Sequence, residues 1–364
     1  MKAVAVFPKG HEVKVIDVPE PRLEAPGQVR VRTLEVGVCG TDKEIVQGLH
    51  GRPPQGEDHL IVGHECLGEV VEVGAGVKDV KVGDLVVPRV RRPCSEASCA
   101  PCRQGHADFC VTGQYTERGI QGAHGFCAEF FVEDARYLHV LPRELRQVGV
   151  LTETLTIAEK ALRQVALLRQ RVPWKRDAPE RAVVLGAGPV GLLGAMALVR
   201  AGYETTVYSH SRKPNKKAEL AESWGVPYLS SEELEVKALV EQRGRADVVY
   251  EAAGAAGAAF TLVSGLAPNG VFVFTGVPES EKEKVDQGAL MKQLVLNNQV
   301  LLGTVNAAAE DFEAAVRDLS LFRGTWPGGL EAIITARHPP EDYAEVVTGD
   351  KSSAVKDVIV FSRG

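Results

Sequence analysis

The stretch "VVLGAGPVG" at residues 183–191 decides how the second half of the chain folds. It places Gly186, Gly188 and Gly191 in the spacing G-x-G-x-x-G, between a run typical of a strand and a pattern typical of a helix. The first glycine permits a tight turn, the second lets a pyrophosphate approach the backbone, and the third lets the helix pack on the strand. The phosphates would meet free N–H groups at the helix N-terminus. A glycine-rich packing turn is the alternative.

The same stretch lies within the longest apolar run of the chain, residues 182–199, for which a membrane helix is the alternative interpretation. Glycines and Pro189 interrupt that run, and strand and helix patterns alternate from 181 to about 305. This alternation predicts a doubly wound parallel sheet. We expect Pro189 and Val190 to contact the dinucleotide together with the three glycines of the motif.

The next strand should decide which dinucleotide binds, because a carboxylate at its end would hold the ribose 2′-hydroxyl of NAD. Here the strand ends in hydroxyls and cations, without a carboxylate: Ser209, His210, Ser211, Arg212 and Lys213. These groups would hold a 2′-phosphate, so we expect NADP, with some use of NAD. The alternative is that Arg212 and Lys213 only solvate the start of a helix.

Length and composition predict a globular chain of two domains, since 364 residues exceed one ordinary core. The net charge of −6 argues against a broad nucleic-acid footprint. The start, "MKAVAVFPKG", has neither a signal nor a transit peptide pattern. We therefore expect a cytoplasmic protein with neither a membrane nor a nucleic-acid partner.

The first 150 residues are rich in short strands and turns, which is typical of a partly open β-barrel. A helical pattern follows at 151–170, and the tail contains a helical segment and a final strand, "VKDVIVFS". We expect an α/β protein. Its predicted parts are a catalytic domain at 1–170 with a lobe at 90–112, a doubly wound cofactor domain at 171–306, and a return to the catalytic domain at 307–364.

Four of the seven cysteines, Cys94, Cys99, Cys102 and Cys110, form the pattern C-x4-C-x2-C-x7-C. Close cysteine pairs on a loop suit tetrahedral thiolate coordination of zinc. Because four thiolates leave no ligand position open, this zinc would be structural. Four reduced cysteines without a metal are the alternative.

A second set of metal-binding residue types is scattered along the chain: Cys39, His64, Glu65 and Glu153. Thiolate, imidazole and carboxylate could hold a zinc with one position open, as catalytic sites do. Asp42 could accept a hydrogen bond from the ring of His64 and so fix its tautomer. Spacing alone does not join these residues, and a buried Cys39 with a structural His64 is the alternative.

The chain resembles the zinc-containing medium-chain alcohol and polyol dehydrogenases over nearly its whole length. "GHECLGEVVEVGAGV" at 63–77 fits their zinc signature, and "KVGDLVV", the four-cysteine lobe and "VVLGAGPVG" follow in the family's order. "YTERGIQGAHGF" at 115–126, "LTETLTIAEKAL" at 151–162 and "GTVNA" at 303–307 resemble the archaeal-type glucose 1-dehydrogenases. The resemblance implies a GroES-like catalytic domain, a Rossmann domain, two zincs per chain and a homodimer or homotetramer.

The resemblance also implies roles at the second metal set. Cys39 and His64 would bind the catalytic zinc, and Glu65 and Glu153 would bind it directly, through water, or alternately during turnover. Thr41 would hydrogen-bond the reacting oxygen and pass its proton outward, toward His50 or the nicotinamide ribose.

Sugar contacts are implied for Glu117, Glu153 and Asn306, and a cofactor contact for Val305. A surface charge at Glu117 and a loop cap at Asn306 are the alternatives. Val90 and Ile157 stand where some relatives have polar residues that contact sugar, which leaves the aldose open.

The expected reaction is oxidation of the anomeric carbon of glucose or a similar aldose to the lactone, with hydride transfer to NADP. A zinc dehydrogenase acting on a polyol, a secondary alcohol or threonine is the nearest rival. A redox-inactive NADP-binding sensor with a structural zinc is a rival from another class. A zinc-ribbon nucleic-acid binder is disfavoured by the charge.

Overall fold

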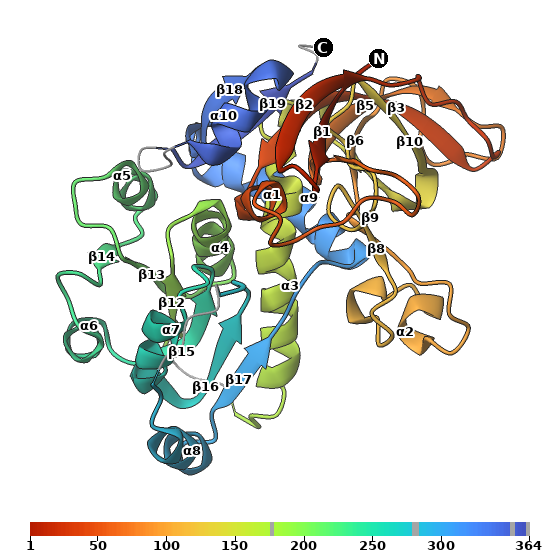
Figure 1. Cartoon of the computed structure of the whole chain (residues 1–364). Helices are drawn as coiled ribbons and strands as arrows, with labels where there is room; N and C mark the ends of the chain where they lie inside the picture. The colour runs from red at the N-terminus through yellow and green to blue at the C-terminus, as the bar shows by residue number, and fades with distance from the viewer. Residues whose placement is uncertain (175–177, 279–283, 350–353, 362–364) are drawn as a thin grey trace. The chain divides into compact units, whose positions relative to one another are not determined.

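The computed structural model describes residues 1–174, 178–278, 284–349 and 354–361. The chain forms two compact units: unit 1 comprises Met1–Thr156 and Asn306–Gly364, and unit 2 comprises Ile157–Val305 (Figure 1). The first boundary falls inside helix α3 (Thr152–Arg169), whereas the sequence placed it at residue 170. The helical periodicity of α3 continues across this boundary, so the sequence pattern does not reveal where unit 1 ends.

Unit 1 is built from short, mostly antiparallel strands. Its strands are β1 (Lys2–Phe7), β2 (Glu12–Asp17), β3 (Gln28–Val38), β4 (Leu60–Ile61), β5 (Glu65–Val73), β6 (Leu85–Pro88), β7 (Arg91–Arg92), β8 (Thr116–Arg118), β9 (Gly122–Ala123), β10 (Phe130–Asp134), β11 (Leu138–Leu141), β18 (Ile334–His338) and β19 (Lys356–Val360). The largest sheet has the order β11-β6-β5-β3-β19-β18, and β10 also pairs with β3. Smaller sheets have the orders β2-β1-β4 and β7-β8-β9.

The inward residues of these strands form the core of unit 1. β3 alternates between half-buried and buried positions before its last residues become fully buried, and Val31, Val36 and Phe126 are completely buried. The helices of this unit are α1 (Gly40–Val46), α2 (Ala100–Arg103), α9 (Ala309–Thr325) and α10 (Tyr343–Thr348). The tail, Asn306–Gly364, belongs to unit 1, where β19 lies beside β3 in the largest sheet.

Unit 2 is a parallel sheet with the strand order β14-β13-β12-β15-β16-β17. Its strands are β12 (Arg181–Leu185), β13 (Glu204–Ser209), β14 (Tyr228–Ser230), β15 (Ala246–Glu251), β16 (Leu266–Phe274) and β17 (Val300–Gly303). Its helices are α4 (Pro189–Arg200), α5 (Lys216–Ser223), α6 (Val236–Arg243), α7 (Ala256–Leu262) and α8 (Gln287–Leu296). If the six strands are numbered 1 to 6 along the chain, their order across the sheet is 3-2-1-4-5-6, which is the order of doubly wound nucleotide-binding sheets. The predicted doubly wound sheet is confirmed.

The apolar run at 182–199 is divided between strand β12, a glycine turn and helix α4. Within the described residues, no helix combines the length and the apolar character needed to cross a bilayer. The glycines thus mark a turn between two buried elements.

Candidate functional site

Cys39, His64 and Glu65 meet at one end of the β3–β5 pair in unit 1. Cys39 follows β3 and caps the N-terminus of α1, and the antiparallel register sets Gly37 opposite Glu65. Cys39 Sγ lies 3.2 Å from His64 Nε2, and donor atoms of all three residues lie within 4.8 Å of one another. A thiolate, an imidazole and a carboxylate at this separation fit a zinc ion with a position left for another ligand.

The charges of this group favour a cation. Burial by itself would lower the pKa of His64, but the negative charges of Cys39 and Asp42 raise it well above its ordinary value. Asp42 is completely buried, and its Oδ2 accepts a hydrogen bond from the Cys39 backbone N–H at 2.9 Å. Its Oδ1 lies 3.8 Å from His64 Nδ1, too far for the hydrogen bond expected from the sequence. Asp42 therefore acts on the ring through its charge.

Lys356, which the sequence reasoning missed, forms an ion pair with Glu65. Both side chains are almost fully buried, at 1% and 3% exposure. Burial alone would lower the pKa of Lys356, but the charges of Glu65 and Cys39 raise it. Gly37 leaves the room for this pair, since a Cβ there would lie 2.1 Å from Glu65 Oε2 and 2.8 Å from Lys356 Cε. A lone lysine within the apolar strand "VKDVIVF" was the signal that could have revealed it.

Three other residues expected at the catalytic site, Glu153, Thr41 and His50, are not part of the Cys39–His64–Glu65 group. Glu153, in the first turn of α3, is not within the 4.8 Å group, although burial raises its pKa to about 7 and the charge of His64 opposes that rise. Thr41 is half-buried in the first turn of α1, two residues after Cys39. His50 is exposed, and among the described residues no contact joins its ring to Thr41. Direct ligation by Glu153 and a relay through His50 therefore stay predictions.

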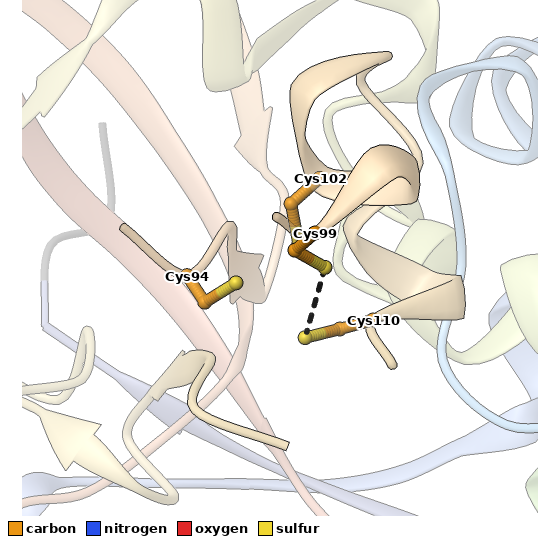
Figure 2. Close-up of side chains that lie close together, drawn as sticks. All are labelled: Cys94, Cys99, Cys102 and Cys110. Carbon is orange, nitrogen blue, oxygen red and sulfur yellow. Dashed lines mark hydrogen bonds between the residues drawn. The ribbon is translucent and has the colours of Figure 1, made fainter. Parts of the chain in front are cut away.

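The four cysteines of the lobe converge as expected from their spacing. Their sulfur atoms lie within 4.8 Å of one another, with Cys99 Sγ 3.9 Å from Cys110 Sγ (Figure 2). None of the four forms a disulfide. Backbone N–H groups of Cys102 and Val111 lower the pKa of Cys99. This donor set is closed and fits a structural zinc.

Glu117 and Asn306 are joined directly, although they are 189 positions apart in the chain. Asn306 Nδ2 donates to Glu117 Oε1 at 2.9 Å. Arg91 Nε donates to the same oxygen at 3.0 Å, and Arg91 Nη2 forms an ion pair with it, also at 3.0 Å. Its guanidinium also lies 3.7 Å from the centroid of the Tyr115 ring. Glu117 is only 7% exposed, so the alternative of a surface charge is wrong. Asn306 also accepts a hydrogen bond from the next backbone N–H, so it caps its loop as well.

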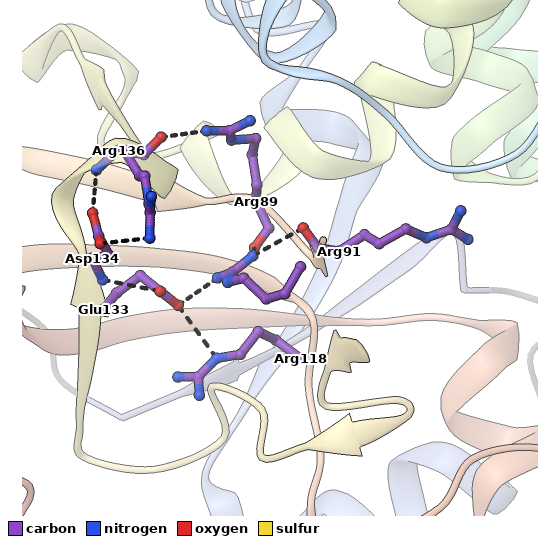
Figure 3. A network of polar contacts seen from close by, with 7 residues as sticks. Arg89, Arg91, Arg118, Glu133, Asp134 and Arg136 are labelled. Atoms are coloured by element: carbon purple, nitrogen blue, oxygen red, sulfur yellow. Dashed lines mark hydrogen bonds and ion pairs between the residues drawn. The ribbon is translucent and has the colours of Figure 1, made fainter. Parts of the chain in front are cut away.

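An arginine network holds the strands that carry this pair (Figure 3). The buried Glu133 of β10 pairs with Arg92 of β7 and with Arg118 of β8, the latter at 3.4 Å. Arg91 and Glu117 stand opposite each other in the β7–β8 register. The network therefore fixes both members of the Arg91–Glu117 pair. Of the two departures noted from the sequence, Val90 is a buried core residue beside β8, and Ile157 is half-buried.

The glycine loop of unit 2 has the geometry expected of a phosphate site. Gly186 has φ +107°, and a Cβ at Gly191 would lie 2.2 Å from the carbonyl oxygen of Gly186. A Cβ at Gly188 would meet no atom within 4 Å, so the backbone is open there. Gly188 is the N-cap of α4 and has no side chain to bond the first N–H groups of the helix, which leaves them available to an anion. Pro189 and Val190 form the first turn of this helix.

The residues expected to bind the 2′-phosphate lie at the end of β13 and differ in exposure and in ion pairing. Ser209 is buried, whereas His210, Ser211 and Arg212 are exposed. Lys213 forms an ion pair with Glu222 and so is less available than expected. Val305 is 55% exposed in unit 2, and its carbonyl accepts a hydrogen bond from Lys160 at 2.8 Å.

A third group of metal-ligand types, Glu57, His59 and His124, also lies within 4.8 Å. The Ile61 backbone N–H donates to His124 Nδ1 at 3.1 Å, so the proton of the neutral ring is on Nε2. His124 Nε2 is 2.7 Å from Glu57 Oε2 and donates to it. His124 Nε2, the nitrogen that would have to bind a metal, therefore carries a proton and donates it to Glu57. Glu57 and His124 thus form a hydrogen-bonded pair.

Comparisons with known proteins bear on both units. A sequence profile described as "Glucose dehydrogenase C-terminus" matches residues 146–361, and one described as "Alcohol dehydrogenase GroES-like domain" matches residues 25–143. The glucose 1-dehydrogenase of Methanocella arvoryzae is 40% identical over 96% of this chain and 97% of its own. Glucose 1-dehydrogenase 2 of Vulcanisaeta moutnovskia is 42% identical over 96% of each chain. The structure titled "Haloferax mediterranei glucose dehydrogenase in complex with NADP, Zn and gluconolactone" has a TM-score of 0.90 and 38% identity, with 100% of both chains covered. The expected fold class and family resemblance are confirmed.

Proposed function

The chain belongs to the glucose dehydrogenase family of zinc-type medium-chain dehydrogenases, and on that premise we propose that it oxidises glucose or a similar aldose at the anomeric carbon to the lactone, with hydride transfer to NADP. The observation that carries this proposal is the Cys39–His64–Glu65 group, in which His64 and Glu65 are buried and Cys39 is half-buried, and which has the donor types and the spacing of an open zinc site. The solved Haloferax relative, whose title names NADP, Zn and gluconolactone, supports the same reaction.

Cys39, His64 and Glu65 would hold the catalytic zinc, which as a Lewis acid stabilises negative charge on the oxygen of the reacting sugar. Lys356 pairs with the Glu65 carboxylate and would hold it in position. Thr41, two residues after Cys39, would accept the proton of the anomeric hydroxyl and pass it outward. Cys94, Cys99, Cys102 and Cys110 would hold the second, structural zinc.

Glu117 and Asn306 would bind the sugar. The hydrogen bonds and the ion pair that the described residues form with the Glu117 carboxylate all run through Oε1, so its Oε2 is available to a sugar hydroxyl. Arg91 and Asn306 hold that carboxylate in one orientation, and a preorganised acceptor favours one arrangement of hydroxyls. Removing the Glu117 carboxylate should therefore raise the KM for the sugar.

The glycine loop and the β13 end would bind NADP. The open backbone at Gly188 and the free N-terminus of α4 suit the pyrophosphate, and His210 and Arg212 suit the 2′-phosphate. A His210→Ala/Arg212→Ala variant should lose more affinity for NADP than for NAD. Equal losses for both cofactors would contradict the 2′-phosphate assignment.

Initial rates test the whole proposal. Zinc-loaded protein is supplied with glucose, galactose, xylose, sorbitol, threonine and 2-butanol, each with NADP and with NAD. We expect aldose oxidation with NADP to be the fastest reaction, and Cys39→Ser to abolish it while the fold persists. Turnover of a polyol or alcohol without aldose oxidation would remove the sugar assignment and leave the zinc chemistry.

We further propose that unit 2 forms a dimer with a second copy of the chain. Among the described residues, strand β17 is at the edge of the sheet, and an edge strand presents a row of unpaired backbone groups. Helix α8 has no buried residue and exposes Met291, Val295 and Leu296 at 68–69%. Light scattering should give twice or four times the chain mass, and a Met291→Lys/Val295→Lys variant should give a smaller assembly. An unchanged mass in that variant would contradict this surface.

We propose a reducing compartment, the cytoplasm, because close cysteine thiols outside a disulfide persist there. Fractionation of cells that produce the native chain should recover the enzyme with cytoplasmic markers. Recovery with an exported fraction would contradict this assignment.

A further inference from the structure

The two groups expected to hold the 2′-phosphate already face a carboxylate. Glu232, in the segment after β14, places Oε1 3.3 Å from His210 Nδ1 and Oε2 3.8 Å from Arg212 Nη2. Each oxygen thus faces one of the two groups. The end of β13 itself has no carboxylate, and Glu232 approaches it from the segment after β14, a neighbourhood that the sequence pattern alone does not reveal.

Hydrogen bonds hold the two segments against each other. Tyr228 OH donates to the Ser211 carbonyl at 2.8 Å, and Ser230 Oγ donates to the His210 carbonyl at 3.0 Å. The Glu232 backbone N–H in turn donates to Ser230 Oγ at 3.2 Å. The segment that carries Glu232 is therefore held beside the end of β13 by hydrogen bonds that do not involve the exposed ion pairs.

From this geometry we propose that Glu232 is a specificity-determining residue that weakens binding of the 2′-phosphate and so moves the cofactor preference toward NAD. The inference rests on the proposed use of NADP. A 2′-phosphate carries nearly two negative charges and must take Arg212 and His210 from Glu232 before it can bind them. Once bound, it also lies near the Glu232 carboxylate and is repelled by it. NAD has neither interaction, because its ribose 2′-hydroxyl is uncharged.

The size of the effect follows from exposure. The side chains of His210, Arg212 and Glu232 are 83%, 64% and 43% exposed, so water and salt screen their charges. Exposed pairs contribute little individually. We expect removal of the Glu232 charge to tighten 2′-phosphate binding by roughly threefold to tenfold, and more at low salt than at high salt.

The experiment uses two probes that differ only in the group in question: 2′,5′-ADP, which carries the 2′-phosphate, and 5′-AMP, which lacks it. Dissociation constants are measured by calorimetry for the wild-type holoenzyme, Glu232→Gln and Glu233→Gln at low and high salt. Glu233 is the matched control, because it is the adjacent exposed carboxylate. Glu232→Gln should bind 2′,5′-ADP more tightly, should bind 5′-AMP as the wild type does, and should lower the KM ratio of NADP to NAD. Glu233→Gln should change none of these.

An unchanged or weakened affinity of Glu232→Gln for 2′,5′-ADP would overturn the inference, as would an equal gain for both probes. The same gain in Glu233→Gln would overturn it too, since the effect would then be general charge. If the wild type binds the two probes equally, the NADP assignment itself fails, and the wild-type measurement shows this without reference to any variant.

Discussion

Replacing Glu117 by glutamine tests whether the buried Arg91–Glu117 pair both supports unit 1 and presents the sugar acceptor. Glutamine keeps the size of the side chain and an acceptor oxygen but removes the charge. Arg91 Nε donates to Glu117 Oε1 at 3.0 Å and Nη2 completes the ion pair at the same distance, and the two side chains are 6% and 10% exposed. Screening by water is therefore small, and the charge should matter more here than in an exposed pair.

The magnitude follows from the two hydrogen bonds that the Glu117 carboxylate accepts, one from Arg91 Nε and one from Asn306 Nδ2. A hydrogen bond to a charged group contributes about 1.5–3 kcal/mol, against about 0.5–1.5 kcal/mol for a neutral one. Losing that difference twice gives about 2–3 kcal/mol. The value lies below the roughly 3–5 kcal/mol for breaking a buried pair outright, because Arg91 keeps its contact with the Tyr115 ring. For a unit of this size the melting temperature should fall by roughly 4–12 °C.

The assay combines calorimetric melting with steady-state kinetics on zinc-loaded protein. We expect Glu117→Gln to melt lower, to raise the KM for glucose by roughly tenfold and to leave the KM for NADP unchanged. Glu57→Gln is the matched control: Glu57 is 42% exposed and pairs with His124, so its loss should move the melting temperature by no more than about 2 °C. A double-mutant cycle with Arg91→Met measures the coupling between the two residues.

A melting temperature equal to that of the wild type, together with a coupling energy near zero, would refute the reasoning about the buried pair. A lower melting temperature with an unchanged KM for glucose would keep the structural role of Glu117 and remove its role in sugar binding. The two halves of the prediction can therefore fail separately.

Three further predictions concern other parts of unit 1. Cys99→Ser should lose one of two zincs per chain by mass spectrometry and lower the melting temperature, and retention of both zincs would contradict a closed four-thiolate site. Lys356→Met should leave Glu65 buried and unpaired, at a cost of about 3–5 kcal/mol, and should reduce zinc occupancy, so wild-type stability and metal content would show that this pair does not position Glu65. Burial lowers the pKa of His139 to about 4, against 6.5 when exposed, so its contribution to stability is complete above about pH 6.5 and declines as the pH falls toward 4. Urea unfolding should show the wild type losing up to about 2 kcal/mol more than His139→Phe between about pH 7 and about pH 5, and parallel losses would contradict this.

The glycine loop was predictable because each of its constraints is local. Gly186 must adopt a positive φ, Gly191 must admit a neighbouring carbonyl, and Gly188 must leave its surface open, and all three conditions involve the loop and its two flanking elements. Spacing in the sequence is enough to specify such a loop. The lobe cysteines were predictable for the same reason, since all four belong to one short segment.

The Cys39–His64–Glu65 group could not be joined by spacing, because strand pairing brings it together. The β3–β5 register sets Gly37 opposite Glu65, and that register depends on which faces of both strands are buried. Family resemblance supplied the grouping. It did not supply Lys356, whose partner is identified only when β19 is known to lie beside β3. The boundary inside α3 was equally hidden, because one uninterrupted helix serves both units.

The order of the chain explains why the site of unit 1 was the hardest part to derive. Unit 2 is one contiguous segment, so its loop and its strand order follow from neighbours in sequence. Unit 1 is divided, and its second segment supplies Asn306 to Glu117 and Lys356 to Glu65. Lys356 supplies the partner of a Glu65 carboxylate that would otherwise be buried without a cation, which is costly, and Asn306 adds a second donor to the Glu117 carboxylate that Arg91 already pairs. The return segment is therefore required by the energetics of the site as well as by the sheet that it completes.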